Sequence, residues 1–478
     1  MSLKINDVQM HVLNMHTRFP FKYGIASLVA LPHLFVRIEV EVDGRSSVGL
    51  SADGLPPKWF TKNPETPFDS DLDEMLTVIR HAVESLRDVS TAESAFDFWL
   101  SVYREQETWA ASTGYPPLLW GFGVSLVERA VIDAVCRASG KPFGSAVREG
   151  ALGIRLGDIH PELEGVDPAS LLVGQPLRSI QVRHTVGLAD PLTNADIPAS
   201  ERLTDGLPQS LEDNIQVYGL THLKIKLCGD ADQDRARLKG IAALMSEREC
   251  RFTLDGNEQY TELLPFRELW DAIRSDEDLT DFLEGLIFVE QPLHRDVALT
   301  NQAQRVLSEW NDCPPMIIDE SDDSLDSSRR ALECGYVGTS HKNCKGIFKG
   351  IANACLMTKR QADTGIAHIL SSEDLANVGP VALTQDLAVL ATLGITHSER
   401  NGHHYFAGLS MFPEEVQAQV VENHASLYRS NGSFLALAVS DGLLDISSVV
   451  DAPFGYDFEL DTTRYTPLAA WSSDSLEI

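Results

Sequence analysis

The sequence lacks the features of membrane-spanning, secreted and disulfide-rich proteins. None of its apolar runs approaches the roughly 20 residues that span a bilayer. The first residues, Met1 to Asp7, have no apolar signal-peptide core. The seven cysteines include no Cys-x-x-Cys pair, and this usage favours free thiols in a reducing compartment. We therefore expect a cytoplasmic protein that is not inserted in a membrane.

Basic residues are also few, since 39 lysines and arginines stand against 70 aspartates and glutamates, for a formal net charge of −31. Binding to nucleic acid needs a basic stripe that follows the phosphate backbone. Nucleic acids and anionic membrane surfaces are therefore disfavoured as partners. The same charge raises a question, because an anionic substrate would need a local source of positive charge.

Apolar content (43%) and aromatic content (8%) are those of an ordinary globular protein. Because 478 residues exceed what one core usually supports, we expect two structural domains. Residues 1–150 are predicted to form an α+β domain. Val8–Leu13 and Leu34–Val42 alternate as antiparallel strands do, an irregular loop is expected at Phe19–Gly24, and Asp43–Gly44 predicts a turn. Residues 51–70 are rich in turn residues, and from about 71 to 140 the apolar period is helical, with Gly140 as a stop.

Residues 151–400 alternate between strand-like and helix-like segments, which indicates an α/β fold, a (β/α)₈ TIM-type barrel. The expected strands are Ile180–Val186, His222–Leu227, Arg251–Leu254, Leu286–Val289, Met316–Ile318, Tyr336–His341, Gly365–Ile369 and Leu393–Thr396. The expected helices lie at about 211–219, 230–248, 261–276, 296–310, 325–334, 346–362 and 378–392. Residues 401–478 lack this alternation, and we expect them to pack back onto the N-terminal domain.

Three acidic residues follow short apolar runs and predict a metal site. Asp255, Glu290 and Asp319 are separated by 35 and 29 residues, an interval that suits one strand, one helix and two loops. Carboxylates at the ends of successive parallel strands converge on one face of a barrel. They repel one another unless a cation lies between them, so the pattern predicts a bound divalent metal.

Lysines lie at the ends of two other expected strands. Lys224 and Lys226 are two residues apart, so both point to the same side of the second strand. Lys342 ends the sixth strand, across the barrel mouth. Burial and like charge disfavour an ammonium group, so such a lysine can serve as a general base. Exposed surface lysines and a lysine that merely begins a loop are the competing interpretations.

The combined order of these residues resembles the enolase superfamily, and in particular its muconate-lactonizing-enzyme-like subgroup. The pattern is Lys-x-Lys on the second barrel strand, then Asp, Glu and Asp on the third to fifth strands, then Lys on the sixth. This sequence matches it with Lys224, Lys226, Asp255, Glu290, Asp319 and Lys342. The resemblance implies a capping domain formed by residues 1–150 and completed by the C-terminal segment, a symmetric homo-oligomer, and a small-molecule carboxylate substrate.

The resemblance also implies a mechanism. Mg²⁺ held by Asp255, Glu290 and Asp319 would bind the substrate carboxylate and stabilise the enediolate formed when the α-proton leaves. Lys226 would be the base on one face and Lys342 the acid or base on the other. Lys224 would bind the carboxylate or depress the pKa of Lys226. Racemisation or epimerisation, cycloisomerisation and β-elimination all stay open.

Further residues are candidates for substrate contacts or for support of the site: Asn257, Glu320, His368, Glu373, Tyr23 and Trp59. Glu320 is expected to point away from the metal and to pair with neighbours. An alternative function is a sugar-acid dehydratase with His368 as base, although the aspartate that its subgroup pairs with this histidine is missing from 335–345. An alternative of another class is a non-catalytic binding protein on the same scaffold.

Overall fold

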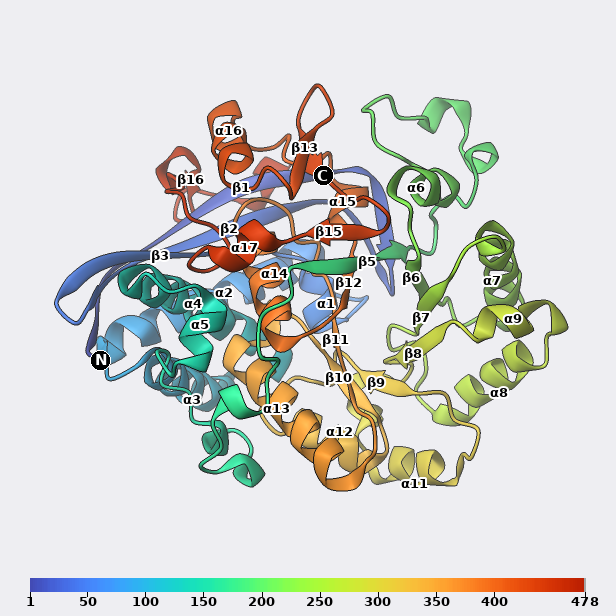
Figure 1. Cartoon of the computed structure of the whole chain (residues 1–478), viewed down its shortest axis with the longest axis horizontal. Helices are drawn as coiled ribbons and strands as arrows, with labels where there is room; N and C mark the ends of the chain where they lie inside the picture. Colours follow the sequence, from blue (N-terminus) through green and yellow to red (C-terminus); the bar gives the residue numbers. More distant parts are fainter. Residues whose placement is uncertain (477–478) are drawn as a thin grey trace.

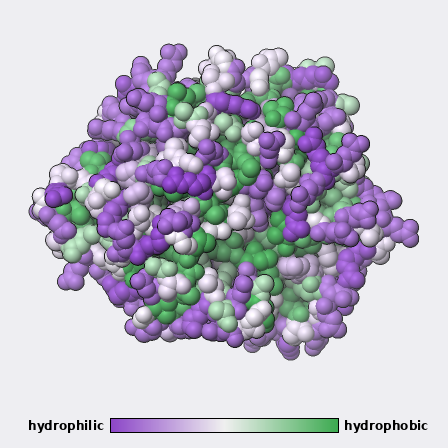
Figure 2. Space-filling view, viewed as in Figure 1, coloured by the Kyte–Doolittle hydropathy of each residue, from purple (hydrophilic) through white to green (hydrophobic). Residues whose placement is uncertain are grey.

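The computed structural model describes residues 1–476, except for the side chain of Tyr23. Figure 1 shows an N-terminal sheet with helices packed against it, beside a closed ring of parallel strands. No helix in the described part is long and apolar enough to cross a membrane. The face shown in Figure 2 is largely hydrophilic, with apolar residues gathered near its middle.

The N-terminal sheet is built on a long hairpin. β1 (Leu3–Tyr23) and β2 (Ala26–Val42) pair antiparallel, and β3 (Arg45–Gly54) follows a turn at Asp43–Gly44. Both turn residues have positive φ, 48° and 79°, as the predicted tight turn requires. The irregular loop expected at Phe19–Gly24 is wrong, because β1 continues through most of it and resumes pairing with β2 after a register shift.

Helices α2 (Phe68–Val89), α3 (Ala95–Thr113) and α4 (Pro117–Ser139) pack on one another, and α4 lies against β3. The glycine predicted to stop α4 is Gly140, in the left-handed conformation at φ 63°. A Cβ atom at Gly49 of β3 would collide with the backbone of α4, so a glycine is needed for this close approach. The smaller elements of this region are α1 (Pro57–Thr61), β4 (Thr91–Ala92) and α5 (Phe143–Arg148).

The predicted barrel is confirmed. Its parallel strands are β5 (Ser179–Val186), β6 (His222–Lys226), β7 (Arg251–Asp255), β8 (Leu286–Glu290), β9 (Met316–Ile318), β10 (Gly338–His341), β11 (Ile369–Ser372) and β12 (His397–Arg400). Each strand pairs with the next, and β12 pairs with β5 to close the ring. The carboxyl ends of all eight strands therefore open on one face.

The last two strands begin later than the sequence predicted. Gly365 and Gly394, placed in or beside the expected strands, are left-handed caps that end α13 and α14 at φ 74° and 77°. The strands follow them as β11 and β12, whose sequences Ile-Leu-Ser-Ser and His-Ser-Glu-Arg are mostly polar. A strand is hard to recognise when its inward-facing residues are polar or charged and become buried through pairing.

A helix is present at each expected position of the barrel, and the one expected at 296–310 is divided in two at Thr300, which caps the second part. The helices are α6 (Leu211–Tyr218), α7 (Ala231–Met245), α8 (Leu263–Arg274), α9 (Thr280–Leu283), α10 (Arg295–Ala298), α11 (Asn301–Glu309), α12 (Ser327–Cys334), α13 (Ile347–Thr364) and α14 (Ala382–Leu393).

The C-terminal segment contacts both the barrel and the N-terminal sheet. β15 (Leu443–Asp445) pairs antiparallel with β5, and β16 (Thr466–Pro467) pairs antiparallel with β1. The remaining elements are α15 (Gly402–Tyr405), α16 (Glu414–Asn423), α17 (Ser447–Asp451) and the hairpin β13 (Tyr428–Ser430) with β14 (Leu435–Leu437). The segment thus ties the N-terminal sheet to the barrel.

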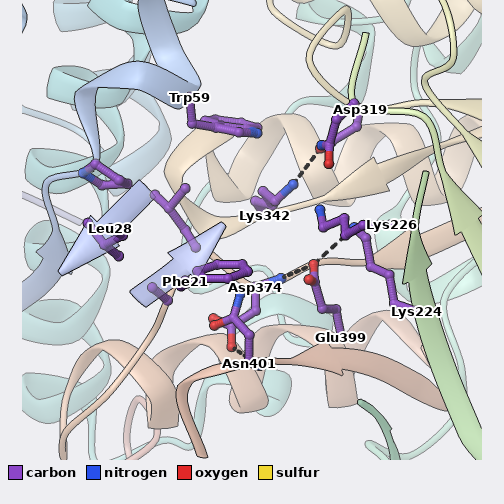
Figure 3. A pocket seen from close by; sticks show the side chains of 14 residues that line it. Phe21, Leu28, Trp59, Lys224, Lys226, Asp319, Lys342, Asp374, Glu399 and Asn401 are labelled. Carbon is purple, nitrogen blue, oxygen red and sulfur yellow. Dashed lines mark hydrogen bonds and ion pairs between the residues drawn. The ribbon is translucent and has the colours of Figure 1, made fainter. Parts of the chain in front are cut away.

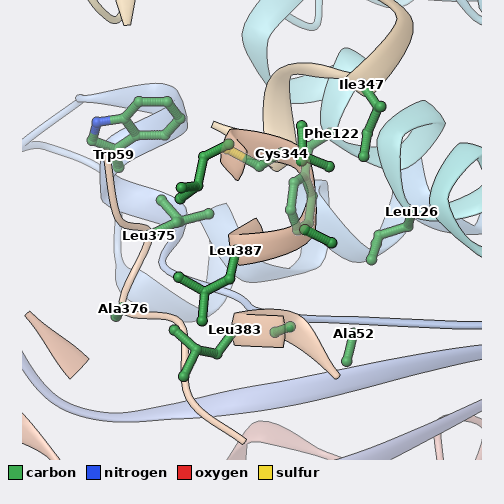
Figure 4. Packing of buried hydrophobic residues seen from close by; sticks show 14 of the residues in the cluster. Ala52, Trp59, Phe122, Leu126, Cys344, Ile347, Leu375, Ala376, Leu383 and Leu387 are labelled. Carbon is green, nitrogen blue, oxygen red and sulfur yellow. The ribbon is translucent and has the colours of Figure 1, made fainter. Parts of the chain in front are cut away.

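Apolar side chains of the two regions pack as one cluster. Figure 4 shows Trp59 and Phe122 of the N-terminal region near Leu375, Leu383 and Leu387 of the barrel. This shared core holds the α1 segment, which carries Trp59, over the carboxyl end of the barrel.

Candidate active site

The predicted acidic residues meet at the carboxyl ends of neighbouring strands. Lys226 of β6 lies beside Asp255 of β7, and Asp255 lies beside Glu290 of β8 in the strand register. Asp319 follows β9, the next strand of the ring. These side chains are at most 6% exposed. The strand-end placement inferred from spacing is therefore what the structure shows.

Lys224 lies at the centre of this group. Its Nζ atom is 2.7 Å from Oε2 of Glu290 and 3.0 Å from Oδ2 of Asp255. It also contacts Glu373, after β11, at 2.7 Å and Glu399 of β12 at 3.0 Å. One ammonium group thus contacts carboxylates from four strand ends, and Figure 3 shows its contact with Glu399.

Asp319 is held by two other lysines. Nζ of Lys342 is 2.5 Å from its Oδ2 atom, and Nζ of Lys345 is 2.7 Å from Oδ1. Lys345 also donates to the backbone carbonyl groups of Asp319 and Ser340, and the Ser340 hydroxyl donates to Asp319. Lys342 lies over the Trp59 ring, 4.6 Å from its centroid. Lys226 pairs with Oδ2 of Asp255 at 2.6 Å.

The cluster balances its own charge. Its carboxylates are Asp255, Glu290, Asp319, Glu373 and Glu399, and its cations are Arg183, Lys224, Lys226, Lys342 and Lys345. An acidic protein therefore holds five cationic side chains at one point, and because five carboxylates balance them, the net positive charge that an anionic substrate needs would come from an added cation.

The pKa values of the lysines differ from the sequence-based expectation. Burial disfavours the ammonium form of Lys224, but Asp255 and Glu290 outweigh it and raise the pKa well above the usual value. Burial likewise opposes the charge of Lys342, and Asp319 reverses this effect and raises its pKa. Both lysines are therefore ammonium ions at neutral pH, because neighbouring carboxylates outweigh desolvation.

The pKa values of the carboxyl groups of Glu290 and Asp319 are shifted in opposite directions. Burial, followed by the charge of Asp255, raises the pKa of Glu290 well above its usual range. Burial has the same tendency at Asp319, but Lys342 and Lys345 outweigh it and hold its pKa well below the usual range. Because the negative charge of Glu290 is disfavoured here, an added cation beside it would stabilise the site.

The donor set has the chemistry of a magnesium site. Asp255, Glu290 and Asp319 offer buried carboxylate oxygens, which Mg²⁺ prefers. Among the described residues, Oε2 of Glu290 has no hydrogen-bond donor, although the Nζ atom of Lys224 is close to it. Within residues 1–476 no group of three or more His, Cys, Asp or Glu side chains is placed to hold a metal ion. In the arrangement described, lysine ammonium groups lie against the oxygens of all three carboxylates, which offer the ligand type for a divalent cation.

A small cavity of about 40 Å³ opens above the cluster. Lys224, Lys226, Lys342, Asp319 and Glu399 line its charged side. Figure 3 shows Phe21, Leu28 and Trp59 on the opposite side, with Lys342 between the two groups. A bound molecule would thus meet charge at one end and apolar surface at the other.

A salt-bridge network fastens the α1 segment to the barrel. Arg295 donates hydrogen bonds to the carbonyl oxygens of Trp59 (2.9 Å) and Phe60 (2.7 Å). The same guanidinium group pairs with Glu258 at 2.8 Å through both carboxylate oxygens. Lys62, which ends α1, reaches Glu258 at 3.1 Å. Trp59 is therefore held over the cavity by barrel residues.

The remaining predicted residues differ in their placement. Asn257 lines the cavity beside Trp59, and Glu373 supports the lysine cluster through Lys224. Glu320 is buried, its Oε2 atom accepts no hydrogen bond from the described residues, and burial with the charge of Asp319 raises its pKa to about 7. The side chain of Tyr23 lies outside the described part of the structure.

His368 is far from the role proposed for it in the dehydratase alternative. It precedes β11, so it lies at the amino end of that strand, whereas Glu373 follows the carboxyl end. It does not line the cavity that holds Lys226 and Lys342. The prediction failed because the seventh strand begins just after His368 rather than ending near it.

Several residues of the site were not predicted from the sequence. Arg183 of β5 points into the barrel and pairs with Glu373, while Glu399 and Asn401 come from the end of β12. Lys345 lies three residues after Lys342 and faces the same carboxylate. Charged residues within otherwise apolar barrel strands were the available signal for Arg183, and correct placement of the eighth strand would have identified Glu399.

Solved structures with this fold are known. The structure is similar to a mandelate racemase/muconate lactonizing protein from Herpetosiphon aurantiacus (TM-score 0.59, 15% identity, covering 95% of this chain and 99% of that chain). It is also similar to muconate lactonizing enzyme from Pseudomonas fluorescens complexed with muconolactone (TM-score 0.57, 16% identity, 95% and 97% covered). A third is dipeptide epimerase from Enterococcus faecalis V583 complexed with Mg and the dipeptide L-Leu-L-Tyr (TM-score 0.56, 16% identity, 92% and 99% covered).

The chain thus has the barrel and N-terminal sheet domain of the enolase-superfamily fold, as the sequence predicted. No protein-family model and no curated protein matches the sequence. At these identities the similarity establishes the fold, and any activity has to be argued from the site itself.

Proposed function

We propose that the protein is a Mg²⁺-dependent enzyme that removes the α-proton of a small carboxylate substrate. The observation that carries this proposal is one cavity lined by Lys226 and Lys342 beside the Asp255, Glu290 and Asp319 carboxylates. β6 and β10 are four strands apart in a closed ring of eight. The two lysines therefore face a substrate from opposite sides.

We assign the two lysines different roles, although each is paired with one carboxylate. Asp319 holds the proton on Lys342, which suits it to donate a proton or to remain a positive charge beside the reacting carbon. Lys226 would take the α-proton on the other face once its partner Asp255 binds the metal instead. Proton transfer in the reverse direction exchanges these roles, since both sides of the substrate carry a lysine.

Other groups hold the reacting carboxylate in place. Asp255, Glu290 and Asp319 would hold Mg²⁺, which supplies positive charge beside the negative charge that develops on the substrate carboxylate. Lys224 adds a fixed ammonium group to the same side. Trp59, Phe21 and Leu28 place apolar surface on the side of the cavity away from the lysines. Removal of the α-proton is the first step of racemisation or epimerisation, cycloisomerisation and β-elimination alike.

The structure bears differently on the two alternative functions, a dehydratase and a non-catalytic binding protein. A dehydratase that uses His368 as base has no support, because His368 lies at the other end of β11. A non-catalytic binding protein would need a positive charge for a carboxylate but not lysines on opposite sides of it, and Lys226 and Lys342 both line the cavity. The cytoplasmic location and the symmetric homo-oligomer remain proposals that rest on the sequence and its resemblance.

Exchange of substrate α-protons with solvent deuterium tests this function. The protein would be incubated in D₂O with Mg²⁺ and a panel of carboxylic acids, N-acyl amino acids and sugar acids, and deuterium at the α-carbon would be followed by proton NMR. We expect exchange with at least one class. No exchange in any class would contradict the proposal and favour a binding protein.

A further inference from the structure

The end of the cavity away from the lysines is built from apolar side chains of three separate segments. These are Phe21 and Leu28 of the β1–β2 hairpin, Pro56 and Trp59 around α1, and Leu375 and Ala376 after β11. Figure 3 shows Phe21, Leu28 and Trp59 facing the side that holds Lys224 and Lys226. Segments from both regions of the chain thus form one apolar wall.

The charged groups that line the cavity already have partners. Lys226 pairs with Asp255, Lys342 with Asp319, and Lys224 with Glu399 among others. Asp374 is the remaining candidate for a substrate cation. Its Oδ1 atom accepts the backbone N–H of Asn377 at 2.7 Å, and Oδ2 accepts those of Asn401 (3.0 Å) and Gly402 (3.4 Å). Its carboxylate is therefore used to hold two loops together.

Two neutral side chains in the cavity wall have an atom without a partner. Oδ1 of Asn257 and Oδ1 of Asn401 are buried and accept no hydrogen bond within the described residues. Buried amide groups gain stability when a ligand supplies the missing hydrogen bond. An uncharged N–H or hydroxyl group on a bound molecule would satisfy either of them.

We propose that the substrate is a monocarboxylate with an uncharged apolar tail and one neutral hydrogen-bonding group. This inference rests on the proposed function, since it assigns the carboxylate to the lysine end. The cavity is narrow, about 40 Å³, so the tail is a short one that the apolar wall contacts closely. A tail ending in an ammonium or a second carboxylate would lose its water against Phe21, Leu28 and Leu375 without gaining a counter-ion.

Binding of three six-carbon acids tests the tail directly. Hexanoate, 6-aminohexanoate and hexanedioate share one carboxylate and a chain of the same length, and they differ in the terminal group. Titration calorimetry with the full-length protein and Mg²⁺ needs no turnover. We expect hexanoate to bind at least about tenfold more tightly than either charged acid, because an unpaired buried charge is strongly disfavoured. Equal binding, or tighter binding of a charged acid, overturns the inference.

A substitution at Ala376 provides a matched pair of variants. Ala376 lines the apolar wall and has φ 56°, a left-handed conformation that aspartate and asparagine tolerate well. Ala376→Asp is expected to improve the binding of 6-aminohexanoate relative to hexanoate by about tenfold or more. Ala376→Asn adds nearly the same volume without charge and is expected to keep the preference for hexanoate. The same change in both variants would contradict an electrostatic origin of the preference.

Deuterium exchange separates failure of this inference from failure of the proposed function. N-acetylnorleucine, N-acetyllysine and N-acetyl-2-aminoadipate carry the same reacting carbon and neutral, positive or negative tails. Exchange of N-acetylnorleucine, with little exchange of the two acids with charged tails, supports both proposals. Exchange confined to an acid with a charged tail overturns the inference of an apolar tail and still supports the proposed enzyme activity. If no acid exchanges but hexanoate still binds preferentially, the proposed enzyme fails while the apolar binding end stands.

Discussion

Replacement of Arg295 by glutamine tests whether the barrel holds the α1 segment over the cavity. The Arg295 side chain is 12% exposed, while Glu258 beneath it is fully buried. Loss of one partner from such a pair costs about 3–5 kcal/mol, because the other charge is left unpaired. Lys62 still reaches Glu258, so we expect the lower end, about 3 kcal/mol in the free energy of unfolding.

The chain offers a matched control for this variant. Arg178 also forms a two-pronged pair, with Asp451, but both side chains are more than half exposed. Solvent screens such a pair, so Arg178→Gln should cost about 0.5 kcal/mol or less. Urea unfolding followed by circular dichroism gives both values.

A second substitution examines the cause of the loss. Glu258→Gln in the Arg295→Gln background removes the unpaired charge, so the double variant should lose less stability than the sum of the two single variants. The Michaelis constant should rise in Arg295→Gln, because the Trp59 carbonyl loses its donor. The reasoning is refuted if Arg295→Gln costs no more than Arg178→Gln.

Two further predictions concern pH and metal. Burial, with help from Arg129, lowers the pKa of His33 from 6.5 to about 3, so the unfolded chain binds a proton first as pH falls. The free energy of unfolding that is present above pH 6.5 is therefore lost as the pH falls toward 3. Urea unfolding at pH 6 and at pH 4 measures this loss. Per pH unit, the wild type should lose about 1.4 kcal/mol more than His33→Leu. Mg²⁺ at 100 times its dissociation constant should stabilise the chelator-treated protein by about 2.7 kcal/mol. Asp319→Asn should lose this stabilisation, and the exposed control Asp451→Asn should keep it. Equal stabilisation of both variants by Mg²⁺ would contradict the metal site.

Much of the barrel could be predicted from the sequence because its middle strands are apolar and end in acidic or basic residues. Asp255, Glu290 and Asp319 end or follow strands whose interiors are otherwise apolar. The strand that leads to Glu399 could not be recognised, because serine, glutamate and arginine replace that apolar run. Inside the barrel the Glu399 carboxylate is stabilised by Lys224 and Thr185, which lie far away in the sequence.

The balance of charge at the site was also beyond sequence patterns. Local spacing placed Lys224 and Lys342 near carboxylates, and desolvation alone predicted a lowered pKa for a buried lysine. The structure shows four carboxylates around Lys224, two of them on strands seven and eight. Summing these charges requires the closed ring, so the direction of the pKa shift follows from tertiary structure rather than from neighbouring residues.

The central claim is that Lys226 and Lys342 transfer protons on opposite faces of one substrate. Its most direct test is deuterium exchange measured separately with each stereoisomer of an active substrate, in wild type, Lys226→Ala, Lys342→Ala and His368→Ala. We predict that each lysine variant loses exchange with one stereoisomer by about a hundredfold or more, whereas His368→Ala behaves as wild type. Loss of exchange in His368→Ala, with exchange retained in both lysine variants, would contradict the account.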